Sequence, residues 1–242
     1  MKELLVVSEN VGLCTFLAKT LREQGLDTVW KVDFRYTSYN EEPDAMCAFG
    51  ASEINVKLPE TVDQIIQTYD IVFSVHCKQI FPKELVEGVD CYNFHPGLNP
   101  FNRGWYPQVF SILNGYPAGA TIHKMDSQVD HGDIVAQREV EVFPQDTSLE
   151  VYNRVIEMEK TLLTENLGTI LSGNCSVSKP SNEGNYNGIA DYRELCKLDL
   201  SKSDTLENHI NLLRALTHGD FQNAKFTKDG ETYWVRLNIQ KL

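Results

Sequence analysis

The sequence has no apolar run long enough to cross a membrane, no Cys-x-x-Cys pair and no secretory signal pattern in its 242 residues. A membrane-spanning helix needs about 20 consecutive apolar residues, so we expect no membrane partner. The six cysteines are dispersed along the chain, which favours reduced thiols over a disulfide framework. We therefore expect a cytoplasmic protein.

Positive charge is scarce. The chain has 22 Lys and Arg residues against 34 Asp and Glu residues, which gives a net charge of −12. All of this excess lies in residues 1–173, whereas residues 174–242 are balanced. Nucleic-acid binders carry a basic footprint, so we expect no nucleic-acid partner. A small phosphorylated ligand needs only one or two local cations and stays possible.

Several common site motifs are also missing. The loop 8–12, after the first predicted strand, has no Gly-x-Gly-x-x-Gly, so there is no dinucleotide fingerprint. No Ser or Cys stands in a nucleophile motif. Four histidines raise the question of a metal centre, but their spacing matches no ligand motif, and we expect no metal. These are His76, His95, His123 and His131.

The hydrophobic pattern predicts an α/β protein with a Rossmann-like core. Residues 2–8 form a short apolar run that is typical of a buried strand, and residues 13–24 have apolar side chains at helical spacing before Gly25. A strand followed by a helix is the typical beginning of an open α/β sheet. Further strands are expected at 27–32, 54–56, 70–75, 90–94, 121–125 and 134–142, and helices at 62–68, 82–87, 106–113 and 148–171.

The remaining chain predicts a small second part. Residues 173–188 are polar and rich in turn formers, residues 206–216 have helical spacing, and Lys228-Asp229-Gly230 predicts a hairpin turn. We therefore divide the chain into a catalytic core, residues 1–173, and a linker with a helix and β-hairpin module, residues 174–242.

The hairpin strand 231–237 is apolar on both faces. Alternation puts Tyr233, Val235 and Leu237 on one face and Trp234 on the other. Two apolar faces need two covering surfaces. The pattern predicts that one face packs on the helix of this module and that the other meets a second subunit, which gives a homodimer.

Three polar residues carry the chemistry. Asn93 and His95 alternate at the end of a predicted strand, and Asp130 follows in a loop before Gly132. An amide N–H can stabilise an oxyanion, an imidazole can accept a proton, and a carboxylate can orient the imidazole. This set suits direct transfer of an acyl group to an amine. Either His95 or Asp130 could be the working base.

The motifs around these residues resemble the folate-dependent formyltransferases. They are Asn-x-His-Pro-Gly-Leu at 93–98, residues 119–126, and Asp-x-Gly-x-Ile within 129–134. Residues 76–82 and 103–107 bring the resemblance closest to N-formyltransferases that act on dTDP-linked 4-amino-4,6-dideoxy sugars. The resemblance is strong over residues 70–173.

The resemblance implies a reaction. The formyl group of 10-formyltetrahydrofolate would pass to the amine of a dTDP-linked 4-amino-4,6-dideoxy sugar, such as dTDP-4-amino-4,6-dideoxyglucose, for O-antigen or another surface polysaccharide. Two alternatives stay open at this point. One is a methionyl-tRNA formyltransferase, which the short, charge-neutral tail argues against, and the other is a formyltetrahydrofolate hydrolase.

The resemblance also implies binding residues. In the family, the backbone of the segment equivalent to 77–81 hydrogen-bonds the pterin. Trp105, just past the Asn-x-His loop, either fills a gap in the surface packing or packs on the deoxy sugar ring. Two roles are equally consistent with Tyr186, namely ordinary packing and stacking on the thymine base. For folate we expect Cys77, Lys78, Ile80, Phe81, Met125 and Asp126, and for the nucleotide sugar Asn10, Lys78, Arg103, Trp105 and Tyr186.

Overall fold

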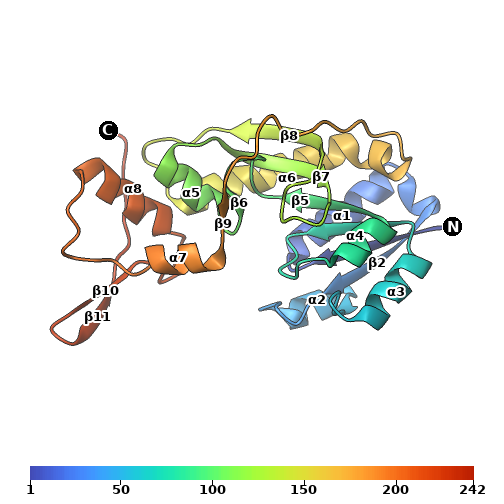
Figure 1. Cartoon of the computed structure of the whole chain (residues 1–242), viewed down its shortest axis with the longest axis horizontal. Coiled ribbons are helices and arrows are strands. Elements are labelled where there is room, and N and C mark those ends of the chain that lie inside the picture. The colour runs from blue at the N-terminus through green and yellow to red at the C-terminus, as the bar shows by residue number, and fades with distance from the viewer. The chain divides into compact units, whose positions relative to one another are not determined.

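The computed structural model describes residues 1–242 and contains a seven-stranded sheet (Figure 1). The strand order is β3-β2-β1-β4-β5-β7-β8, and strands β1 to β5 pair in parallel, whereas β7 runs antiparallel to β5. The strands are β1 Lys2–Ser8, β2 Trp30–Tyr36, β3 Ser52–Glu53, β4 Ile71–Val75, β5 Asp90–His95, β7 Ala118–Lys124 and β8 Ile134–Val140. This order confirms the predicted Rossmann-like α/β class, in which ligands bind at the carboxyl ends of the strands.

Eight α-helices accompany the sheet. They are α1 Val11–Glu23, α2 Pro43–Phe49, α3 Pro59–Thr68, α4 Lys83–Gly88, α5 Pro107–Asn114, α6 Ser148–Leu171, α7 Ile189–Leu195 and α8 Leu206–Leu216. Two short strand pairs complete the chain: β6 Arg103–Gly104 with β9 Tyr186–Asn187, and the hairpin β10 Lys225–Lys228 with β11 Glu231–Trp234. None of the helices combines the length and the apolar composition needed to cross a bilayer.

The central strands are buried on both faces, which is why their sequences are almost continuously apolar. Residues 4–7 of β1 have no exposed surface. Helices α3 and α4 cover one face, where Leu5 and Val72 pack in a cluster with Val62 and Leu85. Near α1, the Gln24 side chain donates a hydrogen bond to the carbonyl of Thr164 in α6.

The chain folds into two compact units, each built from three stretches of sequence. The first unit comprises residues 1–95, 121–137 and 159–181, and the second comprises residues 96–120, 138–158 and 182–242. The division at residue 173 that the sequence suggested stays a prediction.

The predicted positions of two strands, at residues 27–32 and 54–56, were wrong. Residues 54–56 are not a strand, because β3 ends at Glu53 and the N–H of Val56 donates instead to the buried side chain of Gln79. Gly25 has a φ of 68°, and residues 26–28 form a 3₁₀ turn before β2 begins at Trp30. Helices α2 and α7 were not expected, because α2 buries only Met46 and α7 buries no residue, so neither has a regular apolar stripe at helical spacing.

Candidate active site

The site begins with the antiparallel pairing of β5 and β7. In this register Asn93 lies opposite His123, and His95 lies opposite Thr121. Cross-strand partners have neighbouring side chains on the same face of the sheet. The pairing therefore brings two imidazoles and one amide together at the carboxyl end of β5.

The loop between β7 and β8 adds the carboxylate of Asp130. Asp130 has a φ of 50°, a left-handed conformation that Asp tolerates better than most residues. A Cβ on Gly132 would lie 1.7 Å from the carbonyl oxygen of Lys124, so only glycine fits there. The N–H of Lys124 donates to the carbonyl of Asp133 at 2.8 Å and closes the loop. The Asp-x-Gly spacing thus has a steric cause.

The Asp130 carboxylate is the centre of the cluster. Its Oδ1 accepts a hydrogen bond from Asn93 Nδ2 at 2.8 Å and lies 3.6 Å from His123 Nε2. Its Oδ2 lies 3.5 Å from His95 Nδ1. The structure therefore brings Asn93, His95 and Asp130 together, 37 residues apart in sequence at the widest.

His95 is a buried imidazole with one unpartnered ring nitrogen. His95 is only 3% exposed. Burial lowers the pKa of its imidazole, although the nearby Asp130 carboxylate acts in the opposite direction. Nε2 is buried without a hydrogen-bond partner. With its proton on Nδ1, facing Asp130, the ring keeps a lone pair on Nε2 for an incoming proton.

The amide of Asn93 is held from two sides. Its Nδ2 lies 2.8 Å from Asp130 Oδ1 and 3.3 Å from His123 Nε2, while His123 Nδ1 lies 3.3 Å from the carbonyl of Lys124. These contacts suit a His123 that donates from Nδ1 and accepts at Nε2. His123 is thus in direct contact with the candidate catalytic group. The sequence analysis assigned His123 no part in the chemistry, because its partners follow from the β5–β7 register.

Four of the residues expected to hold folate, Cys77, Lys78, Ile80 and Phe81, follow the end of β4, and Met125 and Asp126 follow the end of β7. The backbone groups of Lys78 and Ile80 make no hydrogen bond within the chain, and the Ile80 side chain is 59% exposed. Phe81 is buried in the cluster against which Cys77 and Met125 pack, and burial raises the pKa of the Cys77 thiol to about 12. Asp126 lies 2.7 Å from His131 Nδ1.

Two residues expected to hold the nucleotide sugar have other partners in the first unit. Asn10 caps α1, because its Oδ1 accepts from the N–H of Leu13 at 3.0 Å. The ammonium of Lys78 lies 2.8 Å from the carboxylate of Glu41. Their assignment to the substrate stays a prediction.

The other three belong to the second unit and lie around the β6–β9 pair. Arg103 is paired with Tyr186 in register, and the N–H of Trp105 donates to the carbonyl of Asn187 at 2.9 Å. Gly104 between them has a φ of 95°, and a Cβ there would lie 2.7 Å from the ring of Tyr186. Their role in binding the substrate also stays a prediction.

Comparison with protein families decides the identity of the fold. A model described as "Formyl transferase" matches residues 32–167, and a model described as "N-formyltransferase dimerization C-terminal domain" matches residues 191–241. The chain is a member of the formyl transferase family. The resemblance that the motifs indicated is therefore confirmed, and both motifs of the active-site cluster lie inside the matched range.

Individual formyltransferases are similar over most of the chain. A protein of Mycobacterium tuberculosis named dTDP-4-amino-4,6-dideoxyglucose formyltransferase is 46% identical over 182 residues, which are 75% of this chain and 78% of that protein. Among solved structures, a sugar N-formyltransferase from a Shewanella species is 45% identical with a TM-score of 0.97, covering 100% of this chain and 99% of its own. A 4-N formyltransferase from Francisella tularensis is 40% identical with a TM-score of 0.90 and covers the same shares.

Proposed function

We propose that this formyltransferase moves the formyl group of 10-formyltetrahydrofolate to the 4-amino group of a dTDP-linked 4-amino-4,6-dideoxy sugar, with dTDP-4-amino-4,6-dideoxyglucose as the preferred acceptor. The observation that supports acyl transfer is the buried His95, whose Nε2 has no partner and lies in one cluster with Asn93 and Asp130. The acceptor is inferred from the relative in Mycobacterium tuberculosis and from the 4-N formyltransferase of Francisella tularensis.

His95 is the proton acceptor in this mechanism. A neutral amine loses a proton as it attacks a formyl carbon, and Nε2 of His95 is the unpartnered basic atom of the cluster. The imidazolium that forms is stabilised by the Asp130 carboxylate 3.5 Å from Nδ1. The same ring can then return the proton to the departing nitrogen.

Asn93 supplies the hydrogen bond to the oxygen that becomes negative. Its Nδ2 lies 2.8 Å from Asp130 Oδ1 and 3.3 Å from His123 Nε2, contacts that hold the amide at the carboxyl end of β5. A donor placed at such an oxygen is worth about 10²- to 10³-fold in rate.

The chain offers a fitting place for the pterin of the folate. The backbone N–H and C=O groups of Lys78 and Ile80 are without partners within the chain, and backbone polar groups rarely remain so unless water or a ligand meets them. This segment follows β4, the strand next to β5. Folate would supply the activated formyl group, and these residues would bind and orient it.

The test is a panel of dTDP- and UDP-linked amino sugars, each incubated with 10-formyltetrahydrofolate and analysed by mass spectrometry. We expect a product heavier by one formyl group in place of hydrogen, formed fastest from the dTDP-4-amino-4,6-dideoxyglucose. Formylation of methionyl-tRNA alone would refute the proposal. Folate release at the same rate with and without any amino sugar would identify a hydrolase instead.

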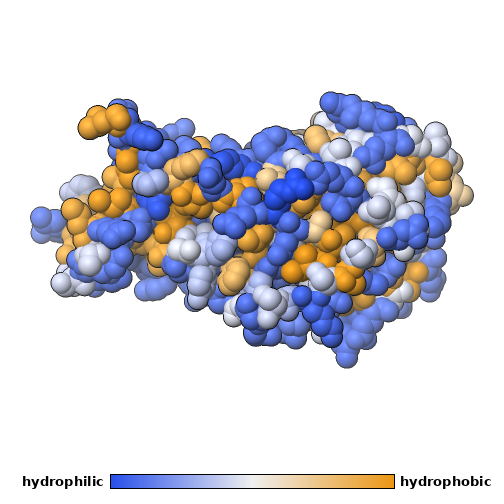
Figure 2. Space-filling view, turned by 90° about the horizontal axis from the view of Figure 1, so that it is seen from above, coloured by the Kyte–Doolittle hydropathy of each residue, from blue (hydrophilic) through white to orange (hydrophobic).

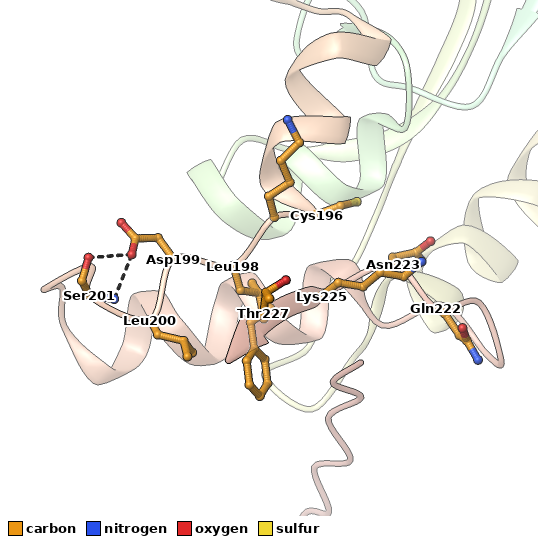
Figure 3. Close-up of a pocket in the computed structure, with 11 residues that line it drawn as sticks. Cys196, Leu198, Asp199, Leu200, Ser201, Gln222, Asn223, Lys225 and Thr227 are labelled. Atoms are coloured by element: carbon orange, nitrogen blue, oxygen red, sulfur yellow. Dashed lines mark hydrogen bonds between the residues drawn. The ribbon is translucent and has the colours of Figure 1, made fainter. Parts of the chain in front are cut away.

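We also propose that the enzyme is a homodimer through residues 191–241, the segment that matches the dimerization model. Figure 2 shows hydrophobic residues gathered at the left of the molecule, where the C-terminal segment lies in Figure 1. In that segment Leu206, Phe221 and Trp234 are exposed. A groove of about 770 Å³ runs between residues 196–201 and β10 (Figure 3). A second copy of the chain would cover this surface.

A further inference from the structure

A second buried polar pair stands outside the Asn93, His95 and Asp130 cluster. The carboxylate oxygens of Glu159, in α6, lie 2.8 and 3.0 Å from Nε2 of His76, at the end of β4. The side chains are 3% and 12% exposed, respectively. A buried carboxylate is costly without a partner, so His76 is what makes Glu159 tolerable in this position. The mechanism above gives the pair no role.

The sheet brings this pair next to the proposed base. Val75 at the end of β4 is paired in parallel with Phe94 in β5, so the residues that follow, His76 and His95, are neighbours at the same sheet edge. Neighbouring strands lie about 4.8 Å apart. His76 also has a φ of 55°, a conformation that a non-glycine residue adopts only when its surroundings hold it.

We propose that Glu159 and His76 are positioning residues for formyl transfer, which together balance the charge around His95 and so set how readily its imidazole takes up a proton. The proposal rests on the proposed function of His95 as the base. Glu159 and His76 contact neither the formyl donor nor the amino sugar in this proposal. They affect the reaction only through the protonation of His95.

The charged groups around His95 show why both members matter. Besides burial, which lowers the pKa of His95, the carboxylates of Asp130 and Glu159 raise it, and His123 and His76 lower it. Glu159 and His76 thus act in opposite directions. Removing either one leaves the other uncompensated in a region with little water to screen it.

A purely structural clamp makes a different prediction. If the pair only fastened α6 to the end of β4, then loss of either member would loosen the same contact. Both variants would then lower activity and would leave the titration of His95 where it was. The direction in which the His95 midpoint moves therefore separates the two roles.

The test compares Glu159→Gln, His76→Asn and the double variant. Gln keeps the shape of Glu159 and can accept from His76, and Asn tolerates the left-handed backbone at position 76. NMR of the His95 imidazole in the free protein, with the signal identified by its loss in His95→Asn, measures the titration without any substrate. We expect the midpoint to fall in Glu159→Gln, to rise in His76→Asn and to lie between them in the double variant.

Kinetics with the formyl donor and the amino sugar form the second readout. We expect kcat to fall about tenfold in each single variant with KM little changed, because a misplaced or mistuned base affects the chemical step. The acid limb of kcat/KM should move in the same directions as the NMR midpoint. Glu165→Gln, an exposed position of the same helix, is the matched control and should behave as the wild type.

Equal midpoints in all variants, or midpoints that move in one direction in both single variants, would overturn the proposal. Thermal melting identifies a variant that fails to fold, and the remaining single variant then decides the sign alone. If the wild type formylates no amino sugar, the proposed function fails, whereas the NMR titration still decides whether the pair tunes His95.

Discussion

At His95, burial and the Asp130 carboxylate act on the imidazole pKa in opposite directions, and burial has the larger effect. The result is a ring that stays neutral at neutral pH and keeps Nε2 available. A more exposed histidine with the same carboxylate would titrate closer to physiological pH. The buried end of β5 therefore both holds His95, the proposed base, in place and keeps its imidazole neutral.

Replacement of His95 tests whether the imidazole moves the proton. We expect His95→Asn to fold and to bind the dTDP-sugar but to lose about 10²- to 10⁴-fold in kcat, the range for general acid–base groups. Steady-state kinetics together with calorimetric binding measures both properties. Turnover close to that of the wild type would remove His95 from the mechanism.

Replacement of Asn93 tests the oxyanion donor. We expect Asn93→Ala to lower kcat by about 10²- to 10³-fold, because its hydrogen bond matters most when the formyl oxygen is negative. A change confined to KM would show that Asn93 only binds substrate. The same assay serves for both variants, so their losses can be compared directly.

The pH dependence follows from the direction of the His95 shift. The active form has a neutral imidazole, and the folded pKa lies below the ordinary histidine value of about 6.5. Activity carried by this group is therefore lost only as pH falls through that lowered pKa, and it is fully present above it. We expect kcat/KM to rise from acid to neutral pH, with a second limb from the substrate amine. A flat profile between about pH 5 and 9 would contradict both titrations.

At the scale of strands and helices, the sequence was most informative where a pattern was long. The buried strands β1, β4 and β5 and the long helix α6 were predicted nearly to the residue, because apolar runs and helical spacing are strong signals. Helices α2 and α7 were missed because they bury at most one residue each and therefore show no clear apolar stripe. The strand expected at residues 54–56 failed because a side-chain contact from Gln79 replaces the ladder.

The candidate site was predictable to the extent that motifs carry it. Asn93 and His95 lie on one strand, and Asp130 belongs to a recognisable loop. His123 lies inside the motif at 119–126, but neither it nor Glu159 was predicted to be a site residue. Their proximity depends on the β5–β7 register and on where a turn of α6 meets β4, which hydrophobic patterns do not specify.

The loop between β7 and β8 gives a test at this scale. In Gly132→Ala the new methyl group would meet the backbone of Lys124, which cannot move aside as a side chain can. We expect Asp130 to shift, kcat to fall about 10²-fold and the free energy of unfolding to fall by about 1–3 kcal/mol.

Gly168→Ala is the control for this substitution. Its Cβ would meet only the Gln24 side chain at 3.9 Å, and alanine in a helix is favoured over glycine by about 0.5–1 kcal/mol. We expect unchanged kinetics and equal or higher thermal stability. Chemical denaturation and kcat/KM for the pair check both statements, and an active Gly132→Ala of normal stability would contradict the steric argument.

At the scale of the whole molecule, assembly is the property to measure. Light scattering at micromolar concentration should give about twice the 27.5 kDa of one chain. Trp234→Glu or Val235→Glu should give monomers or insoluble protein, because a carboxylate on a covered apolar face costs its hydration. Both substitutions leave Asn93 and His95 unchanged. The activity of a soluble monomer therefore also shows whether one chain suffices for catalysis.

A wild-type mass near that of a single chain would contradict the homodimer. Glu231→Gln, an exposed position of the same strand, serves as the control and should keep the mass of the wild type. A dimer that persists in both Glu variants would place the interface elsewhere in the chain.

The interleaving of the two compact units has a consequence for synthesis on the ribosome. The first unit needs residues 159–181 to complete its helix layer, although its strands β1 to β5 are made before residue 96. Domains usually fold as units while the chain emerges. Here the first unit cannot be complete until the second half of α6 has left the exit tunnel, although all of its parallel strands have been made by then. The unit that begins the chain is therefore completed only after about three quarters of the chain has been synthesised.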